Sequence, residues 1–161
     1  MGHRRGLRLA LPVTGLIGQV EKPRLEDADF YYHIYMRYNI VAGEELKKIL
    51  TGVIDNPIPF NEDMSIGSYI NEPFSESFIK ERSQVHNATA SLYKEKLSSF
   101  LSMINNLTKE DEIHLYFGDD ATCLANRMFL IDFLRGKASK ITLHIVDEYS
   151  GKEIDVQSVC E

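Results

Sequence analysis

A strand–helix–strand pattern between residues 113 and 146 constrains the fold of this chain more than any other feature. The apolar and β-prone run 113–117 predicts a strand, and Gly118 follows it at once. Apolar residues then recur at helical spacing over 121–135, and Gly136 is placed to end that helix. A second β-prone run covers 141–146. This alternation favours parallel strands with a helix packed on the sheet.

The same alternation extends toward the amino terminus. An aromatic run predicts the first strand of the sheet, and short turns separate it from a helix and a second strand. In chain order we expect a strand at 30–38, a turn at 39–43, a helix at 44–50, a strand at 58–60, a loop at 61–68, helices at 75–86 and 88–107, and one further edge strand around Ile154 and Val156. The order predicts a three-layer, Rossmann-like α/β domain whose mostly parallel sheet has four or five strands.

Length and composition fit one globular domain. The chain has 161 residues, of which 43% are hydrophobic and 26% are charged, and a chain of this size can bury a core without a metal or disulfide. Glycine and proline are frequent in residues 1–28. We therefore expect a flexible amino-terminal extension over 1–28 and a single α/β domain over 29–161.

The charge distribution limits the partners of the domain. The net charge is −6, but residues 1–24 hold five basic side chains and one acidic side chain. The rest of the chain is therefore strongly acidic, which disfavours binding to duplex nucleic acid. No apolar run approaches the roughly 20 residues that span a bilayer, and the two cysteines, Cys123 and Cys160, form no CxxC motif. We expect a cytoplasmic protein that binds neither a membrane nor duplex nucleic acid.

Three predicted strand ends carry polar loops, at residues 39–43, 61–67 and 118–120. In parallel α/β sheets, ligands bind beyond the carboxyl ends of the strands. We therefore expect a small molecule to bind there, with Arg82 as a counter-charge. The candidate ligand-binding residues are Asn39, Gly43, Asp63, Ser65, Gly67, Arg82, Gly118, Asp119 and Asp120.

The Gly118-Asp119-Asp120 step leaves a strand and opens a helix. One aspartate suffices to cap that helix, so the second is free to bind a ribose hydroxyl or a divalent cation. With Asp119 or Asp120, the run Asn61-Glu62-Asp63 and Ser65 would form an oxygen-rich pocket that suits magnesium, manganese or calcium. The chain has no G-x-S-x-G elbow, no G-x-G-x-x-G and no P-loop motif, which disfavours a serine hydrolase and a standard nucleotide site.

Three sequence blocks resemble a known bacterial family. They are His33 to Asn39 followed by Gly43 and 46–48, then Ile58 to Gly67 followed by Arg82, and last Glu112 to Asp120 followed by Asn126. Over about residues 32–147 the chain resembles domain-of-unknown-function family 1835. That resemblance implies an α/β fold and a bacterial cytoplasmic protein, and it implies no activity.

Three functions remain open on the sequence. The first is a non-catalytic small-ligand-binding or regulatory module with its pocket at the carboxyl ends of the strands. The second is a metal-dependent phosphoesterase or nuclease that uses Asp63, Asp119 and Asp120. The third is a protein-interaction subunit, with the aromatic strand 30–38 as a sheet edge or dimer surface.

Overall fold

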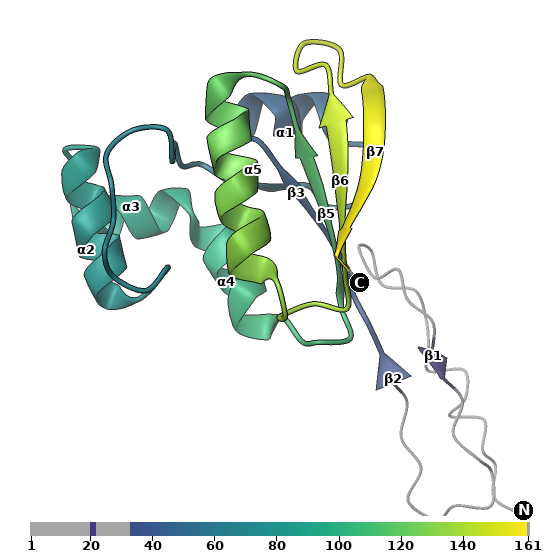
Figure 1. The fold of residues 1–161 in the computed structure, drawn as a ribbon, viewed down its shortest axis with the longest axis horizontal. Coiled ribbons are helices and arrows are strands. Elements are labelled where there is room, and N and C mark those ends of the chain that lie inside the picture. The colour runs from purple at the N-terminus through teal and green to yellow at the C-terminus, as the bar shows by residue number, and fades with distance from the viewer. Residues whose placement is uncertain (1–19, 22–32, 161) are drawn as a thin grey trace, which may run out of the picture.

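A computed structural model of the chain describes residues 20–21 and 33–160. Most of the expected extension over 1–28 lies outside the described residues. Strand β1 (Val20–Glu21) pairs antiparallel with strand β2 (His33–Ile34), and these two short strands form a sheet of their own. The α/β domain follows them (Figure 1).

The main sheet has five strands in the order β4-β3-β5-β6-β7. The first four run parallel, and the last pairs antiparallel with β6. This arrangement confirms a mostly parallel sheet, and the expected edge strand near Ile154 and Val156 is present as its antiparallel member. The strands are β3 (Arg37–Val41), β4 (Ile58–Pro59), β5 (Glu112–Phe117), β6 (Lys140–Val146) and β7 (Glu153–Cys160).

Helices lie on both faces of the sheet. Leu46 and Leu50 of α1 pack with Val41 and Val146 on one face, whereas α2 to α5 contribute to the larger core on the other face. Figure 1 shows α4 and α5 along the sheet, with α2 and α3 farther out. No helix in the described part of the chain is long and apolar enough to cross a bilayer. The helices are α1 (Glu44–Leu50), α2 (Glu76–Val85), α3 (Ala90–Lys96), α4 (Ser98–Asn106) and α5 (Ala121–Leu134).

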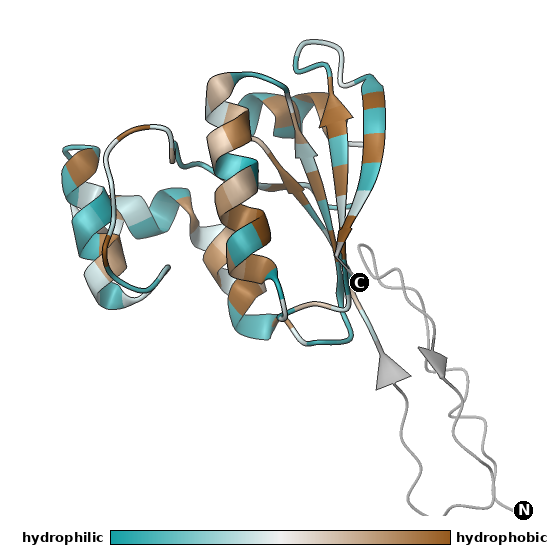
Figure 2. Cartoon of the chain, viewed as in Figure 1, coloured by the Kyte–Doolittle hydropathy of each residue, from teal (hydrophilic) through white to brown (hydrophobic). Residues whose placement is uncertain are grey.

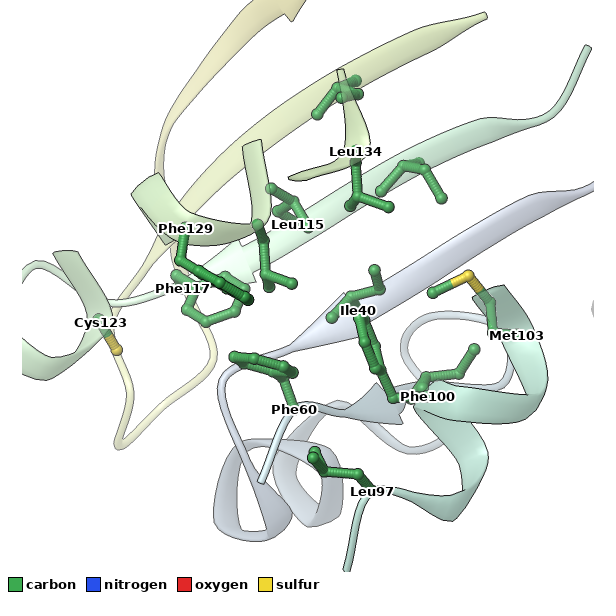
Figure 3. Close-up of a cluster of buried hydrophobic side chains, with 14 of the residues drawn as sticks. Ile40, Phe60, Leu97, Phe100, Met103, Leu115, Phe117, Cys123, Phe129 and Leu134 are labelled. Carbon is green, nitrogen blue, oxygen red and sulfur yellow. The ribbon is translucent and has the colours of Figure 1, made fainter. Parts of the chain in front are cut away.

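Strand alternation places the larger core. Ile113, Leu115 and Phe117 of β5 are fully buried toward α4 and α5, and the hydropathy colouring follows the buried strands (Figure 2). The Phe60 ring lies 5.0 Å from the Phe100 ring and 6.3 Å from the Phe129 ring, centre to centre. These aromatic rings join the end of β4 to α4 and α5 (Figure 3). The residues just after β4 are therefore anchored in the core.

The single helix expected over 88–107 is wrong, because the chain breaks into α3 and α4 at Leu97. Leu97 leaves helical geometry, with φ −102° and ψ 12°, while its side chain is completely buried. α3 packs against α2, and α4 packs against α3 and β4. One straight helix could not reach both neighbours, so packing overrides the continuous apolar periodicity.

The first strand of the main sheet lies farther along the chain than the sequence predicts. β3 spans Arg37–Val41, so Asn39 belongs to the strand rather than to a turn after it. β3 pairs with β4 on one side and β5 on the other. β4 pairs only with Ile40 and Val41, so Arg37 and Tyr38 have a strand partner on the β5 side alone. The expectation that the run 30–38 forms a sheet edge or dimer surface stays a prediction, and residues 30–32 lie outside the described residues. The fully buried Ile40 and Val41, more than the aromatic residues, define this strand.

Candidate functional site

A pocket of about 210 Å³ opens at the carboxyl ends of β3 and β4. From β3 the chain runs through α1 to β4 on one side, and it returns through α2, α3 and α4 to β5 on the other side. Such a reversal of strand order is where ligands bind in open α/β sheets. The pocket is lined by Ala42, Gly43, Phe60, Asn61, Glu62, Asp63, His86, Ala88, Tyr93 and Lys96.

A buried ion pair lies at the wall of this pocket. Glu62 follows β4, Arg82 lies on the inner face of α2, and both side chains are 0% exposed. Arg82 Nε donates to Glu62 Oε2 at 3.1 Å, and Arg82 Nη2 donates to Glu62 Oε1 at 3.0 Å. This bidentate geometry is the strongest form of arginine–carboxylate pairing. The sequence-predicted Arg82 is thus brought to the site, with Glu62 as its partner.

Arg82 also holds the loop that follows Glu62. Its guanidinium donates to the carbonyl oxygens of Asp63 at 2.9 Å and Ile66 at 3.0 Å. Gly67 lies in this loop with φ +65°, and a Cβ there would come within 2.7 Å of Val85. Only glycine satisfies both the backbone conformation and this close approach. Gly67 and Arg82 therefore shape the loop, and neither lines the pocket.

Helix α5 holds the same loop from the other side. Asn126 is buried, donates from Nδ2 to the Glu62 carbonyl at 2.7 Å, and accepts from the Met64 amide at 2.7 Å. The pocket wall is therefore tied to α2 and α5 at once. Such double support preorganises the side chains that face the pocket.

The Glu62 carboxylate accepts hydrogen bonds from four residues. Besides Arg82, its carboxylate accepts from the Tyr93 hydroxyl, the Asp63 amide and His86 Nε2. Burial alone would raise the pKa of Glu62, but the hydrogen bonds, led by those from Arg82 and Tyr93, hold that pKa below its usual range. Burial and the neighbouring Glu62 charge raise the pKa of Tyr93. The carboxylate is therefore ionised, and the phenol keeps its proton.

This network assigns the tautomer of His86. An ionised carboxylate only accepts hydrogen bonds, so Nε2 of His86 carries the proton that faces Glu62. In the neutral ring Nδ1 then keeps a free lone pair. The His86 side chain is 23% exposed and lines the pocket, so the imidazole is accessible to a small molecule while its orientation is fixed.

Asn61 and Lys96 are two further polar residues in the lining of the pocket. Asn61 donates from Nδ2 to Glu44 Oε1 at 3.1 Å and to the Lys96 carbonyl at 3.0 Å, which ties α1 to α3. A second cavity of about 480 Å³ adjoins the first and shares Asn61, Ala88 and Lys96 with it. The first, inner pocket and this outer cavity therefore meet at these three residues.

The other sequence-predicted residues have separate locations. Gly43 and Asp63 line the pocket. Asn39 is buried within β3 and does not line the pocket. Its side chain donates to the Asp55 carbonyl at 2.7 Å, which holds the chain before β4 against β3. Ser65 donates its backbone N–H to Asp63 Oδ1 at 2.9 Å and its hydroxyl to the same oxygen, which closes a local turn.

The Gly118-Asp119-Asp120 step does not reach the pocket. Asp120 caps α5, since its Oδ1 accepts from the Cys123 amide at 2.8 Å. The Asp119 side chain is 83% exposed, with Arg127 at 3.7 Å. The sequence left open which aspartate caps the helix, and the structure assigns that role to Asp120.

Asp120, Cys123 and Glu148 form a second polar cluster, whose ligand atoms all lie within 4.8 Å of one another. Hydrogen bonding with Glu148 lowers the pKa of Asp120, and hydrogen bonding with Asp120 raises the pKa of Glu148. Burial and Glu148 raise the pKa of the Cys123 thiol to about 12. Two carboxylates and a thiol suit a divalent cation such as zinc once the thiol loses its proton. Within the described residues, Asp63 and Asp119 join no such cluster.

No family model, curated protein or solved structure matches the chain. The resemblance to family 1835 therefore stays a prediction, and the functional argument rests on the geometry of the chain itself.

The candidate ligand-binding residues chosen from the sequence do not include Glu62, His86 or Tyr93, and Glu62 was considered only as an oxygen ligand for a cation. A signal was present for the first of them, because Arg82 shares an apolar helix face with Phe78 and Ile79. An arginine on a buried helix face requires a carboxylate partner. Nothing local indicated that the partner was Glu62, 20 residues earlier in the chain.

Proposed function

We propose that this domain binds a small molecule in the pocket at the carboxyl ends of β3 and β4, as a ligand-binding or regulatory module. The observation that carries this proposal is the completely buried Glu62–Arg82 pair at the pocket wall. Burying two charges is costly, and a packed apolar pair of similar size would often be at least as stable. The position of the Glu62–Arg82 pair beside a cavity supports a role in organising a binding site.

The lining of the pocket supports the same proposal. Phe60, Ala42 and Ala88 provide an apolar surface, and His86 and Lys96 provide a few polar groups that converge on it. Small-molecule sites combine these two features, and they occur preferentially where strand order reverses. The tethered loop after β4 would keep the polar groups in place before the ligand arrives.

A thermal-shift screen tests the proposal. The purified chain is screened against nucleotides, sugar phosphates, amino acids and short carboxylic acids. A ligand that binds only the folded state, at a hundred times its Kd, raises the free energy of unfolding by about 2.7 kcal/mol. Ala88→Trp would fill the pocket and abolish the shift, while Ala121→Trp on the exposed start of α5 is the matched control. A ligand whose shift survives Ala88→Trp binds elsewhere, which would contradict the proposal.

The alternative is a metal-dependent phosphoesterase or nuclease that uses Asp63, Asp119 and Asp120. It requires activity that depends on manganese or magnesium and disappears with a chelator. It has less support, because Asp120 is engaged in capping α5 and clusters with Cys123 and Glu148 rather than with Asp63. Hydrolysis of bis-p-nitrophenyl phosphate with manganese, lost in Asp63→Asn and Asp119→Asn, would favour this alternative over ligand binding alone.

A further inference from the structure

His86 differs from the two other histidines that face a carboxylate in the described part of the chain. His114 is buried, with Nε2 3.6 Å from Glu112 Oε2 and Nδ1 in contact with His144. His144 contacts Glu153 through Nδ1, and its Nε2 lies 2.7 Å from Nδ1 of His114. Both nitrogens of His144 are therefore occupied. His86 contacts Glu62 through Nε2 alone, and within the described residues its Nδ1 has no hydrogen-bond partner. Among the histidines that the structure describes, only His86 combines an oriented ring, a nitrogen left for another molecule and a position on a pocket.

The surroundings of His86 suit a general base. An imidazole that donates one N–H to a buried carboxylate has a fixed tautomer, and the carboxylate stabilises the imidazolium that forms when the other nitrogen takes a proton. Arg82 and Tyr93 hold Glu62 through three hydrogen bonds. Binding a ligand would not by itself require an acceptor that is held so firmly.

The two cavities indicate the substrate class. The inner pocket of about 210 Å³ has apolar walls from Ala42, Phe60 and Ala88, which fit a short acyl chain. The outer cavity of about 480 Å³ has room for a larger leaving group. Lys96 lines both cavities, and within the described residues its ammonium makes no ion pair. A cation at that junction would stabilise negative charge that develops on a carbonyl oxygen.

We propose that this pocket hydrolyses small carboxylic esters, with His86 as the general base. His86 Nδ1 takes a proton from a water molecule while the water oxygen adds to the ester carbonyl carbon. The bond between that carbon and the alcohol oxygen then breaks, and the imidazolium returns the proton to the leaving alcohol. The products are a carboxylic acid and an alcohol, and water is the only co-reactant. This inference rests on the proposed function, because it uses the same pocket.

Hydrolysis of p-nitrophenyl acetate by the full chain tests the inference. Positioned acid–base groups contribute about 10²- to 10⁴-fold to rates, so His86→Asn should lower kcat/KM by at least about 100-fold. The matched control is His144→Asn, which removes a histidine that also contacts a glutamate but lies outside the pocket. Its kcat/KM should stay within about twofold of the unaltered chain.

Three results would overturn the inference. They are hydrolysis no faster than in buffer, equal hydrolysis by His86→Asn, and equal losses in His86→Asn and His144→Asn. Melting curves of both variants check that they fold. If Ala88→Trp abolishes the thermal shift of a ligand found in the screen, but hydrolysis does not depend on His86, the catalytic inference fails and the proposed function stands. If neither binding nor hydrolysis responds to Ala88→Trp, both fail.

Discussion

At the scale of single residues, the Glu62–Arg82 pair is the most consequential contact of the chain. The arginine uses its donors on the carboxylate and on the carbonyl oxygens of Asp63 and Ile66. Lysine could not replace it, because an ammonium lacks the planar fork of donors that these acceptors require. One side chain therefore sets both the charge state of Glu62 and the path of the loop.

Removing Arg82 should be strongly destabilising. Arg82→Met leaves the buried Glu62 carboxylate without its main partner, and we expect the free energy of unfolding to fall by about 3–5 kcal/mol. Urea unfolding measures this change. The matched control is Lys94→Met, which breaks the exposed pair with Glu76 and should cost less than about 1 kcal/mol. Equal costs for the two variants would contradict the importance given to burial.

His114 should make the stability depend on pH. Burial, together with Arg37 and His144, lowers the pKa of His114 to about 4. Between pH 6.5 and 4 the unfolded chain therefore binds a proton that the folded chain does not, so the free energy of unfolding falls as pH falls through that range. The loss attributable to His114 is roughly 3 kcal/mol. Urea unfolding at pH 7 and pH 5 should show a smaller difference for His114→Gln, and an unchanged difference would argue against this origin.

At the scale of elements, local sequence signals determine where helices begin, and long-range packing determines where a helix is interrupted. α2 begins after Ser75 and α5 begins after Asp120, and in both helices the cap side chain accepts a backbone N–H three residues later. The break at Leu97 has no such local signal, because it places α3 against α2 and α4 against β4. Helix starts were therefore easier to predict than the interruption of a continuous apolar stripe.

The two adjacent aspartates before α5 should behave differently. Asp120→Ala removes the acceptor of the Cys123 amide, and losing a cap of this kind costs about 1 kcal/mol. Asp119→Ala is the control, since its side chain is 83% exposed and its removal should change the free energy of unfolding by less than about 0.5 kcal/mol. Thermal melts of both variants make the comparison. A larger loss for Asp119→Ala would contradict the assignment of the cap.

At the scale of the whole molecule, the two ends of the described chain contribute unequally. β1 pairs with β2 in a two-stranded sheet, whereas β7 pairs with β6 over most of its length in the main sheet. Ile154 and Val156 of β7 remain exposed. The contribution of β7 to stability therefore comes mainly from its pairing with β6 rather than from burial of its side chains.

Truncation compares these two ends. Removing residues 1–28 should shift Tm by less than about 2 °C, which corresponds to under 1 kcal/mol for a domain of this size. Removing residues 152–161 should lower Tm by clearly more, because it removes a complete ladder and leaves β6 unpaired on that side. Differential scanning calorimetry measures both. A large loss on removing 1–28 would contradict the expected boundary between extension and domain.

The α/β class, the mostly parallel sheet and most of the elements, from α1 at 44–50 to β6 near 141–146, could be predicted from the sequence alone. Helical and strand periodicity, caps and turns are interactions among residues close in the chain, so they can be predicted without a structure. The general location of the site followed from the rule that ligands bind at strand ends.

The residues that make up the site could be identified only from their positions in the folded chain. Glu62 is 20 residues from Arg82, 24 from His86 and 31 from Tyr93 along the chain. These side chains meet because the loop after β4 contacts α2 and α3, and no local pattern specifies that approach. The same packing kept Asp119 and Asp120 away from the pocket and buried Asn39 inside the sheet. A buried charge network depends on long-range contacts, so the chemistry of this pocket could be assigned only after the elements had been placed in space.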